Sequence, residues 1–196
     1  MLETVNLDQR LEKPDYRTQL RPLQDRLHRL QRACSDAPVG TIVVFEGWDA
    51  CGKGGIIRRL TRRLKPRTLR MHTTREPEWR RAYREINEFE RQLDRTGVLV
   101  VKFWIHIGPE EQLTRFEARK DSPYKSWKLT DEDWRNRQKW AAYEEAVEEM
   151  LQRTSTAAAP WTIVEGNNKR FARVRAARHL ADQLAAHLGE PEADAR

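Results

Sequence analysis

Residues 41–55 read TIVVFEGWDACGKGG, and this stretch decides the fold. The opening run TIVVF is typical of a buried strand, and the glycines and lysine after it lead into a helix. Gly47, Gly52 and Lys53 match the G-x-x-x-x-G-K spacing of a phosphate-binding loop, or P-loop. Glycines let backbone N–H groups turn toward phosphate oxygens, and the helix N-terminus adds its positive dipole end. The context therefore favours a phosphate site over a simple glycine turn.

The loop offers separate candidates for phosphate and for metal. Lys53 can reach a phosphate as a point charge, and a common P-loop follows this lysine with a Ser or Thr that holds Mg²⁺. This chain has Gly54 there, so we expect Asp49 to hold the metal, with a turn residue as the alternative role. The residues expected around the phosphates are Gly47, Asp49, Ala50, Gly52, Lys53, Gly54 and Gly55.

Composition bounds the class of protein. A chain of 196 residues and 23.2 kDa fits one domain with a proper core, and seven Trp argue against disorder. The net charge of +7 and pI near 9.7 suit a polyanionic ligand. No stretch resembles a signal peptide or could span a bilayer, so we expect a cytoplasmic protein without a membrane partner. Cys34 and Cys51 show no metal-ligand or disulfide spacing.

Apolar periodicity predicts helices alternating with strands. Helices are expected at about residues 15–32, 56–64, 79–95, 109–120, from Thr130 (with Asp133 completing a capping box) and 169–187. Strands are expected at about residues 41–45, 67–73, 98–105 and 161–164. This alternation indicates an α/β fold with a mainly parallel sheet flanked by helices. We expect one domain over 1–196, with a loose arm at 1–14 and a disordered tail at 189–196.

Seven separated motifs resemble the polyphosphate kinase 2 family, in the family's order along nearly the whole chain. They are FEGWDACGKGG (45–55), YREINEFE (83–90), KFWIHI (102–107), EQLTRFEAR (111–119), SWKLT (126–130), APW (159–161) and NK (168–169). The resemblance implies a P-loop kinase-like sheet, similar to thymidylate kinase, with a lid. It also implies phosphoryl transfer between inorganic polyphosphate and a nucleoside mono- or diphosphate (ADP/ATP, GDP/GTP or AMP), with Mg²⁺, by a homo-oligomer.

The same resemblance assigns roles to individual residues. Lys53 would stabilise the transferred group, and Asp49 would lie at the Mg²⁺ site. The stretch 115–128 resembles the lid that closes over the phosphates, with Arg115, Arg119, Lys125 and Lys128 as its cations. These residue types suit the chemistry, because phosphoryl transfer needs alignment and neutralisation of charge on phosphate oxygens. Arginine adds a planar fork that makes paired hydrogen bonds.

One motif of the family is absent. In the family a third strand ends in Asp-Arg-Ser-Trp-Tyr, whose Asp is the second metal carboxylate, but here Asp-Arg occurs only at 25–26 and 94–95, away from any preceding apolar run. Residues 79–83 match the part of the family that follows this motif, yet they come almost directly after residue 77. A crossover unit of roughly 30 or more residues is therefore missing, and with it a central strand. An alternative function is therefore a catalytically impaired relative that binds nucleotide or polyphosphate, or associates with an intact paralogue.

The remaining candidates have simpler interpretations. We expect His72 and His106 to be structural, and Cys51 to be a small filler, with a reactive thiol at a helix N-terminus as the alternative. The basic cluster at 58–67 is most simply an exposed helix face, although it could steer polyphosphate. A nucleic-acid-binding protein has the charge in its favour but no recognisable module, so no nucleic acid partner is expected. The Trp residues with core-like spacing are 104, 127, 134, 140 and 161.

Overall fold

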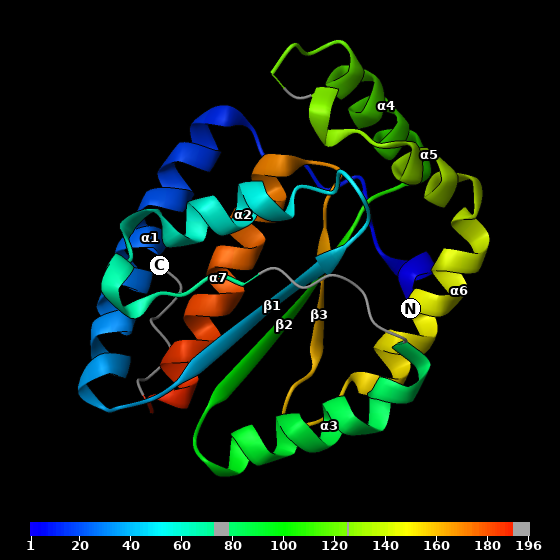
Figure 1. Cartoon of the computed structure of the whole chain (residues 1–196). Coiled ribbons are helices and arrows are strands. Elements are labelled where there is room, and N and C mark those ends of the chain that lie inside the picture. The colour runs from blue at the N-terminus through cyan, green and yellow to red at the C-terminus, as the bar shows by residue number, and fades with distance from the viewer. Residues whose placement is uncertain (73–78, 125, 190–196) are drawn as a thin grey trace.

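The computed structural model describes residues 1–72, 79–124 and 126–189 (Figure 1). The helices in these ranges are α1 (Lys13–Asp36), α2 (Lys53–Leu60), α3 (Trp79–Arg95), α4 (Pro109–Lys120), α5 (Asp131–Gln138), α6 (Trp140–Thr154) and α7 (Lys169–His187). The strands are β1 (Thr41–Gly47), β2 (Leu99–His106) and β3 (Trp161–Glu165). In the described part of the chain, no helix is long and apolar enough to cross a membrane.

The strands form one parallel sheet in the order β1-β2-β3. Thr41 pairs with Leu99 at the start of β1, and Lys102 pairs with Trp161 at the start of β3. Helices α1, α2 and α7 cover one face of the sheet, α3 and α6 cover the other, and α4 and α5 project beyond the carboxyl ends of the strands (Figure 1). The chain therefore has the predicted α/β architecture, with the P-loop at the sheet edge below α4 and α5.

A buried ion pair ties three elements together beneath the sheet. Lys102 of β2 is 1% exposed, and its ammonium donates to both carboxylate oxygens of Glu90 on α3 at 2.8 Å. The same ammonium donates to the carbonyl of Thr154 on α6 at 2.7 Å. Burial lowers the pKa of Lys102, and the Glu90 carboxylate opposes that shift. Each charge thus depends on the other to remain in the core.

Two local expectations differ from the structure along the first half of the chain. The predicted strand at 67–73 is wrong over its described residues, because Pro66–Thr68 form a 3₁₀ turn and residues 69–72 are irregular; Thr73 lies outside the described part. The loose arm expected at 1–14 is wrong at its start. Leu2 is 2% exposed and its N–H donates to Glu148 of α6 at 2.5 Å, so the first residues pack against the body.

The long helix expected from Thr130 is two helices. Its start is confirmed, since Thr130 and Asp133 form the predicted capping box. The helix ends at Gln138 because Lys139 leaves the helical conformation, with φ −103° and ψ 26°, and α6 begins at the next residue. This break lets α5 lie beyond the carboxyl ends of the strands, on the side of the P-loop, while α6 packs on the sheet face that α3 also covers (Figure 1).

Candidate functional site

The P-loop has the backbone shape that the sequence predicts. It joins the end of β1 to the start of α2, and Gly47 and Gly52 have φ values of 147° and 109°. A Cβ at Gly47 would lie 2.5 Å from the carbonyl oxygen of Ile105, so only glycine fits there. Ala50 also has a positive φ, 60°, which is uncommon for a residue with a side chain and costs of order 1 kcal/mol or more. The loop therefore stores strain that its surroundings must hold.

Lys53 is the first residue of α2, and its side chain folds across the loop. Its ammonium donates to the carbonyl oxygen of Gly47 at 2.5 Å and reaches that of Trp48 at 3.4 Å. Lys53 as a whole is half-buried. The N-terminus of α2 and this ammonium together make an electropositive site of the kind that binds phosphate.

Asp49, within the P-loop, interacts with residues of the projecting helices α4 and α5. Burial is the main reason that the pKa of Asp49 is raised, and the negative charge of Asp133 on α5 raises it further. The Lys53 ammonium, a hydrogen bond from Asn136 on α5 and the Arg119 guanidinium on α4 all lower it. Residues from three elements therefore converge on this one carboxylate.

The donor set around Asp49 fits the Mg²⁺ that the resemblance implies. The carboxylates of Asp49 and Asp133 are hard oxygen ligands, which Mg²⁺ prefers. In the described part of the chain, no group of three or more His, Cys, Asp or Glu side chains could hold a metal ion. Mg²⁺ is commonly bound through one or two carboxylates together with substrate phosphates and water, so this smaller set is of the right kind.

Sequence reasoning treated Asp133 only as a capping residue and missed Asn136. Their spacing of three residues places them on one face of a helix, which is the signal that could have found them. Gln112 of α4 was also missed; its side chain donates to the carbonyl of Asp49 at 3.2 Å. The distance along the chain between Asp49 and α5 hid these contacts, because only the tertiary fold brings α5 over the P-loop.

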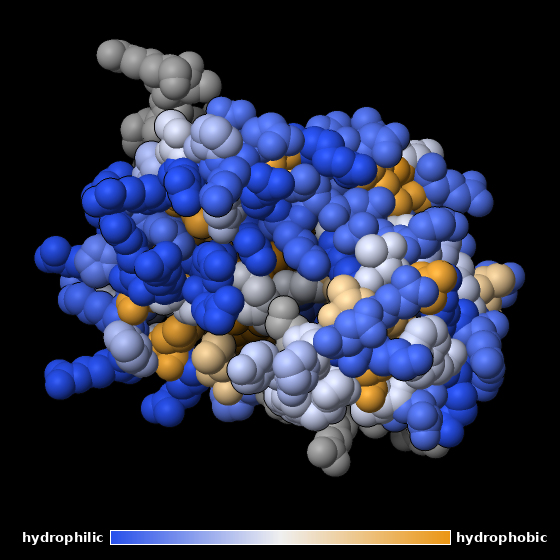
Figure 2. Space-filling model, turned by 90° about the horizontal axis from the view of Figure 1, so that it is seen from above, coloured by the Kyte–Doolittle hydropathy of each residue, from blue (hydrophilic) through white to orange (hydrophobic). Residues whose placement is uncertain are grey.

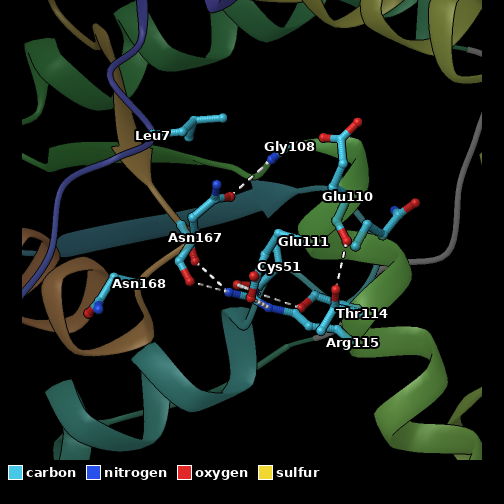
Figure 3. Close-up of polar contacts among 12 residues, drawn as sticks. Leu7, Cys51, Gly108, Glu110, Glu111, Thr114, Arg115, Asn167 and Asn168 are labelled. Carbon is cyan, nitrogen blue, oxygen red and sulfur yellow. Dashed lines mark hydrogen bonds and ion pairs between the residues drawn. The ribbon is translucent and has the colours of Figure 1, made fainter.

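The four cations expected in the lid do not share one role. Arg119 is half-buried on α4 and faces Asp49 closely enough to lower its pKa. Lys125 and the side chain of Lys128 lie outside the described residues. Arg115, by contrast, is 4% exposed and points into the protein, beneath α4, rather than toward the outer surface of the P-loop (Figure 3).

Arg115 has protein partners for every N–H group of its guanidinium. Its Nε donates to Glu111 one helical turn away at 2.6 Å. Its Nη1 donates to the carbonyls of Ala50 (3.0 Å) and Cys51 (2.7 Å), and its Nη2 to those of Gly166 (2.6 Å) and Asn167 (2.9 Å). Arginine has five N–H donors, so this set accounts for all of them. In this geometry no N–H group of Arg115 is left for a phosphate oxygen.

Trp48 packs the P-loop against the body of the protein. Its indole stacks on Trp140 of α6, with centroids 3.8 Å apart, and its N–H donates to Nδ1 of His106 at 3.0 Å. Burial lowers the pKa of His106 to about 4, so the ring is neutral near pH 7 and can accept this bond. The structural role expected of His106 is confirmed, whereas His72 is exposed.

Cys51 is a buried filler, as predicted, and the reactive-thiol alternative is wrong. Its side chain is 2% exposed beneath the loop. Burial raises the pKa of the Cys51 thiol despite the nearby Lys53 ammonium. A thiol that is both buried and protonated is a poor nucleophile.

The tryptophans predicted for the core divide into two groups. Trp104 is 5% exposed, and Trp134 packs edge-to-face on Phe116 with centroids 5.2 Å apart. Trp127 is 74% exposed in the turn between α4 and α5, so its core prediction is wrong.

Figure 2 views the molecule from the side on which α4 and α5 project. Hydrophilic side chains cover most of that face, and apolar ones appear in small separate groups.

The parallel sheet, the P-loop and the helices above it define a P-loop kinase-like α/β protein. A model of the family described as Polyphosphate kinase 2 (PPK2) matches the chain in two segments, residues 10–78 and 71–191. The chain therefore belongs to the polyphosphate kinase 2 family.

Known relatives agree with this assignment. A polyphosphate:AMP phosphotransferase of Pseudomonas aeruginosa is 39% identical over 95% of this chain and 47% of its own length. An ADP-polyphosphate phosphotransferase 2 of Rhizobium meliloti is 34% identical over 89% of this chain and 72% of its own. The crystal structure of a polyphosphate kinase 2 from Arthrobacter aurescens superimposes with a TM-score of 0.89 at 25% identity, covering 100% of this chain and 89% of that one. The chain spans about half the length of the first of these relatives.

The alignments also support an internal gap. The alignment with the Pseudomonas aeruginosa relative is 232 positions long but covers 95% of 196 residues, about 186, so about 46 of its positions face no residue of this chain. The two family segments meet at residues 71–78. Both observations agree with the predicted loss of a crossover unit between residue 72 and α3.

Proposed function

We propose that this chain transfers a phosphoryl group between inorganic polyphosphate and a nucleoside mono- or diphosphate, with Mg²⁺. The observation that carries the proposal is the convergence of Lys53, Asp49 and Arg119 at the P-loop. These groups supply an ammonium, a carboxylate and a guanidinium around the N-terminus of α2. Phosphoryl transfer needs such positioned charges more than any covalent catalyst.

Each residue has a separate part in the transfer. Backbone N–H groups of the loop and the N-terminus of α2 bind the phosphate to be transferred, and Lys53 neutralises its developing charge. Arg119, from α4, is near enough to Asp49 to influence its pKa and adds a second positive charge for the phosphates. Mg²⁺, when bound, would neutralise negative charge on the phosphates. Asp49 would hold that ion, with the Asp133 carboxylate as the candidate for the second acidic ligand that the absent motif provides in the family.

The substrates and setting are proposed by analogy with the relatives. Relatives are named as phosphotransferases for AMP, ADP, GDP and nucleoside diphosphates in general. We extend this substrate class to the present chain, together with ATP or GTP as the product of diphosphate acceptors. A cytoplasmic location and a homo-oligomer complete the proposal, and the positive net charge of +7 suits its polyanionic substrates.

The direct test is ATP formation from ADP, polyphosphate and Mg²⁺ by the full chain, repeated with AMP and GDP as acceptors. Lys53→Ala removes the ammonium at the phosphate and is expected to lower the rate about a hundredfold or more. Lys13→Ala removes an exposed lysine at the start of α1 and serves as the matched control, with an unchanged rate. Turnover that survives Lys53→Ala contradicts the proposal.

The metal assignment has its own test. Asp49→Asn keeps the size of the side chain but removes its charge, so the Mg²⁺ concentration for half-maximal rate is expected to rise at least about tenfold. Tripolyphosphate binding without any turnover in the unaltered chain would instead favour the impaired binding relative. In that case Lys53→Ala abolishes binding rather than catalysis.

A further inference from the structure

Arg115 connects three segments that are far apart in the sequence. Its stem comes from α4, and its guanidinium lies between the P-loop and the connection from β3 to α7 (Figure 3). That connection is itself held in place, because Asn167 accepts a hydrogen bond from the N–H of Gly108 at 3.0 Å and the Gly166 N–H donates to the carbonyl of His106 at 2.6 Å. The guanidinium therefore joins the P-loop to a rigid part of the fold.

The two P-loop carbonyls on Arg115 determine where the loop's N–H groups point. In a planar trans peptide the C=O and N–H groups point in opposite directions. Because the carbonyl of Cys51 turns inward to Arg115 at 2.7 Å, the N–H of Gly52 turns away from it. The carbonyl of Ala50 is held in the same way at 3.0 Å. Binding these carbonyls thus keeps their negative ends away from a phosphate in the loop.

The same contacts hold the strained residue of the loop. Ala50 has a φ of 60°, a conformation that persists only when its surroundings over-determine it. Its carbonyl on Arg115 supplies such a constraint, and the N–H of Cys51 donates to the carbonyl of Trp48 at 3.1 Å on the other side. The guanidinium's charge is balanced by Glu111, so the buried cation does not need an anionic ligand.

We propose that Arg115 is the positioning residue of the P-loop, which fixes its phosphate-binding shape from beneath and does not touch phosphate. The phosphate part of this inference rests on the proposed function, whereas the effect on loop shape does not. Lysine cannot take this role, because its ammonium has three donors and no planar fork, against the five N–H groups used here.

The first experiment needs no ligand, because Cys51 reports on the loop. Iodoacetamide labelling of the full chain is followed at Cys51 and Cys34, both buried, by mass spectrometry of their peptides. Arg115→Lys is expected to speed labelling of Cys51 about tenfold while Cys34, on α1, is unchanged, since local opening exposes only the loop. An unchanged Cys51 rate, or an equal rise at both thiols, overturns the proposal.

Arg137→Lys is the matched control. Arg137 is half-buried, less than Arg115, and its guanidinium donates to the carbonyl of Pro109 at 2.6 Å and the side chain of Gln112 at 3.3 Å, both on α4. The Cys51 labelling rate is expected to stay within about twofold in this variant, because the P-loop carbonyls keep their partner. A rise as large as that of Arg115→Lys would show a general loosening of α4 and count against the proposal.

The second experiment measures binding of inorganic tripolyphosphate with Mg²⁺ by calorimetry. Arg115→Lys is expected to weaken binding about tenfold, because the loop must first be ordered. In Arg115→Ala, millimolar guanidinium chloride should restore both Cys51 protection and binding, and sodium chloride should not. If the unaltered chain fails to bind tripolyphosphate, the proposed function fails. The labelling result still decides whether Arg115 holds the shape of the P-loop. If Lys53→Ala abolishes binding but neither Arg115 variant weakens it, only the positioning role is overturned.

Discussion

Strands β1 and β2 lie side by side in register and are similarly apolar, yet β2 is almost entirely buried whereas β1 is half-buried or exposed. Val43 pairs with Val101 and Phe45 with Phe103, whose rings stack with centroids 5.2 Å apart. Phe103 is fully buried, whereas Ile42 near the start of β1 is 38% exposed. The expectation of a buried strand before the P-loop is therefore wrong at Thr41 and Ile42, although Val43 and Phe45 pack against the core.

The difference follows from what each strand has on its far side. β2 is paired along both edges, by β1 and β3, while within the described residues β1 is paired by β2 alone. In the alignment with the Pseudomonas aeruginosa relative about 46 positions face no residue of this chain, and the family match is divided at residues 71–78. The apolar stripe expected on α3 is exposed as well, with Phe89 58% and Ile86 37% accessible. Burial of a strand thus depends on its neighbours more than on its own sequence.

The largest expected effect comes from breaking the buried ion pair between Lys102 of β2 and Glu90. Glu90→Gln leaves the Lys102 ammonium buried without a counter-charge, so the free energy of unfolding should fall by about 3–5 kcal/mol. Glu88→Gln on the same helix is the control. Its ion pair with Arg91 is exposed and 3.9 Å long, so a change within about 0.5 kcal/mol is expected. Urea unfolding measures both, and equal losses would contradict the special role of the buried pair.

The second prediction compares the loss of stability caused by the same truncation in β2 and in β1. Ile105→Ala in β2 removes a fully buried side chain and should cost about 2–5 kcal/mol, including the cavity left behind. Ile42→Ala in β1 should cost about 1 kcal/mol, because much of that side chain already contacts solvent. Thermal and urea unfolding of both variants check the difference. Similar losses would mean that β1 is covered in solution.

The stability of the protein should depend on pH through His106 at the end of β2. His106 ends β2, and its pKa is about 4 in the folded protein against 6.5 in the unfolded chain, so the unfolded chain binds more protons between these values. Stability is then complete above pH 6.5 and falls as the pH drops toward 4, by about 2 kcal/mol at pH 5. Unfolding of His106→Gln, which cannot titrate, should lack this slope. An identical slope in both proteins would place the titration elsewhere.

The smallest expected effect tests the open side of β1. Ile42→Lys places a charge where the side chain is already partly exposed, so stability should change by no more than about 0.5 kcal/mol. A lysine at this site also discourages pairing of sheet edges between molecules. The measurements are the unfolding midpoint and the solubility. A loss above about 2 kcal/mol would indicate that an element covers Ile42.

Much of the fold was predictable because its signals are local. The α7 boundaries, the capping box at Thr130 and the P-loop turn each depend on residues within a few positions of one another. The break at Lys139 was not predictable in this way, since no proline or glycine marks the end of the helix there.

The sequence by itself determined the family, the parallel α/β order and the identity of Lys53 and Asp49 as P-loop candidates. These conclusions rest on spacings short enough for neighbouring residues to specify. Only the tertiary structure decided that Arg115 turns inward, because four of its five hydrogen bonds reach carbonyls 51 to 65 residues away. It also brought Asp133 near enough to Asp49 for its charge to raise the pKa of that carboxyl. Such pairings depend on how distant segments pack, which no local pattern records.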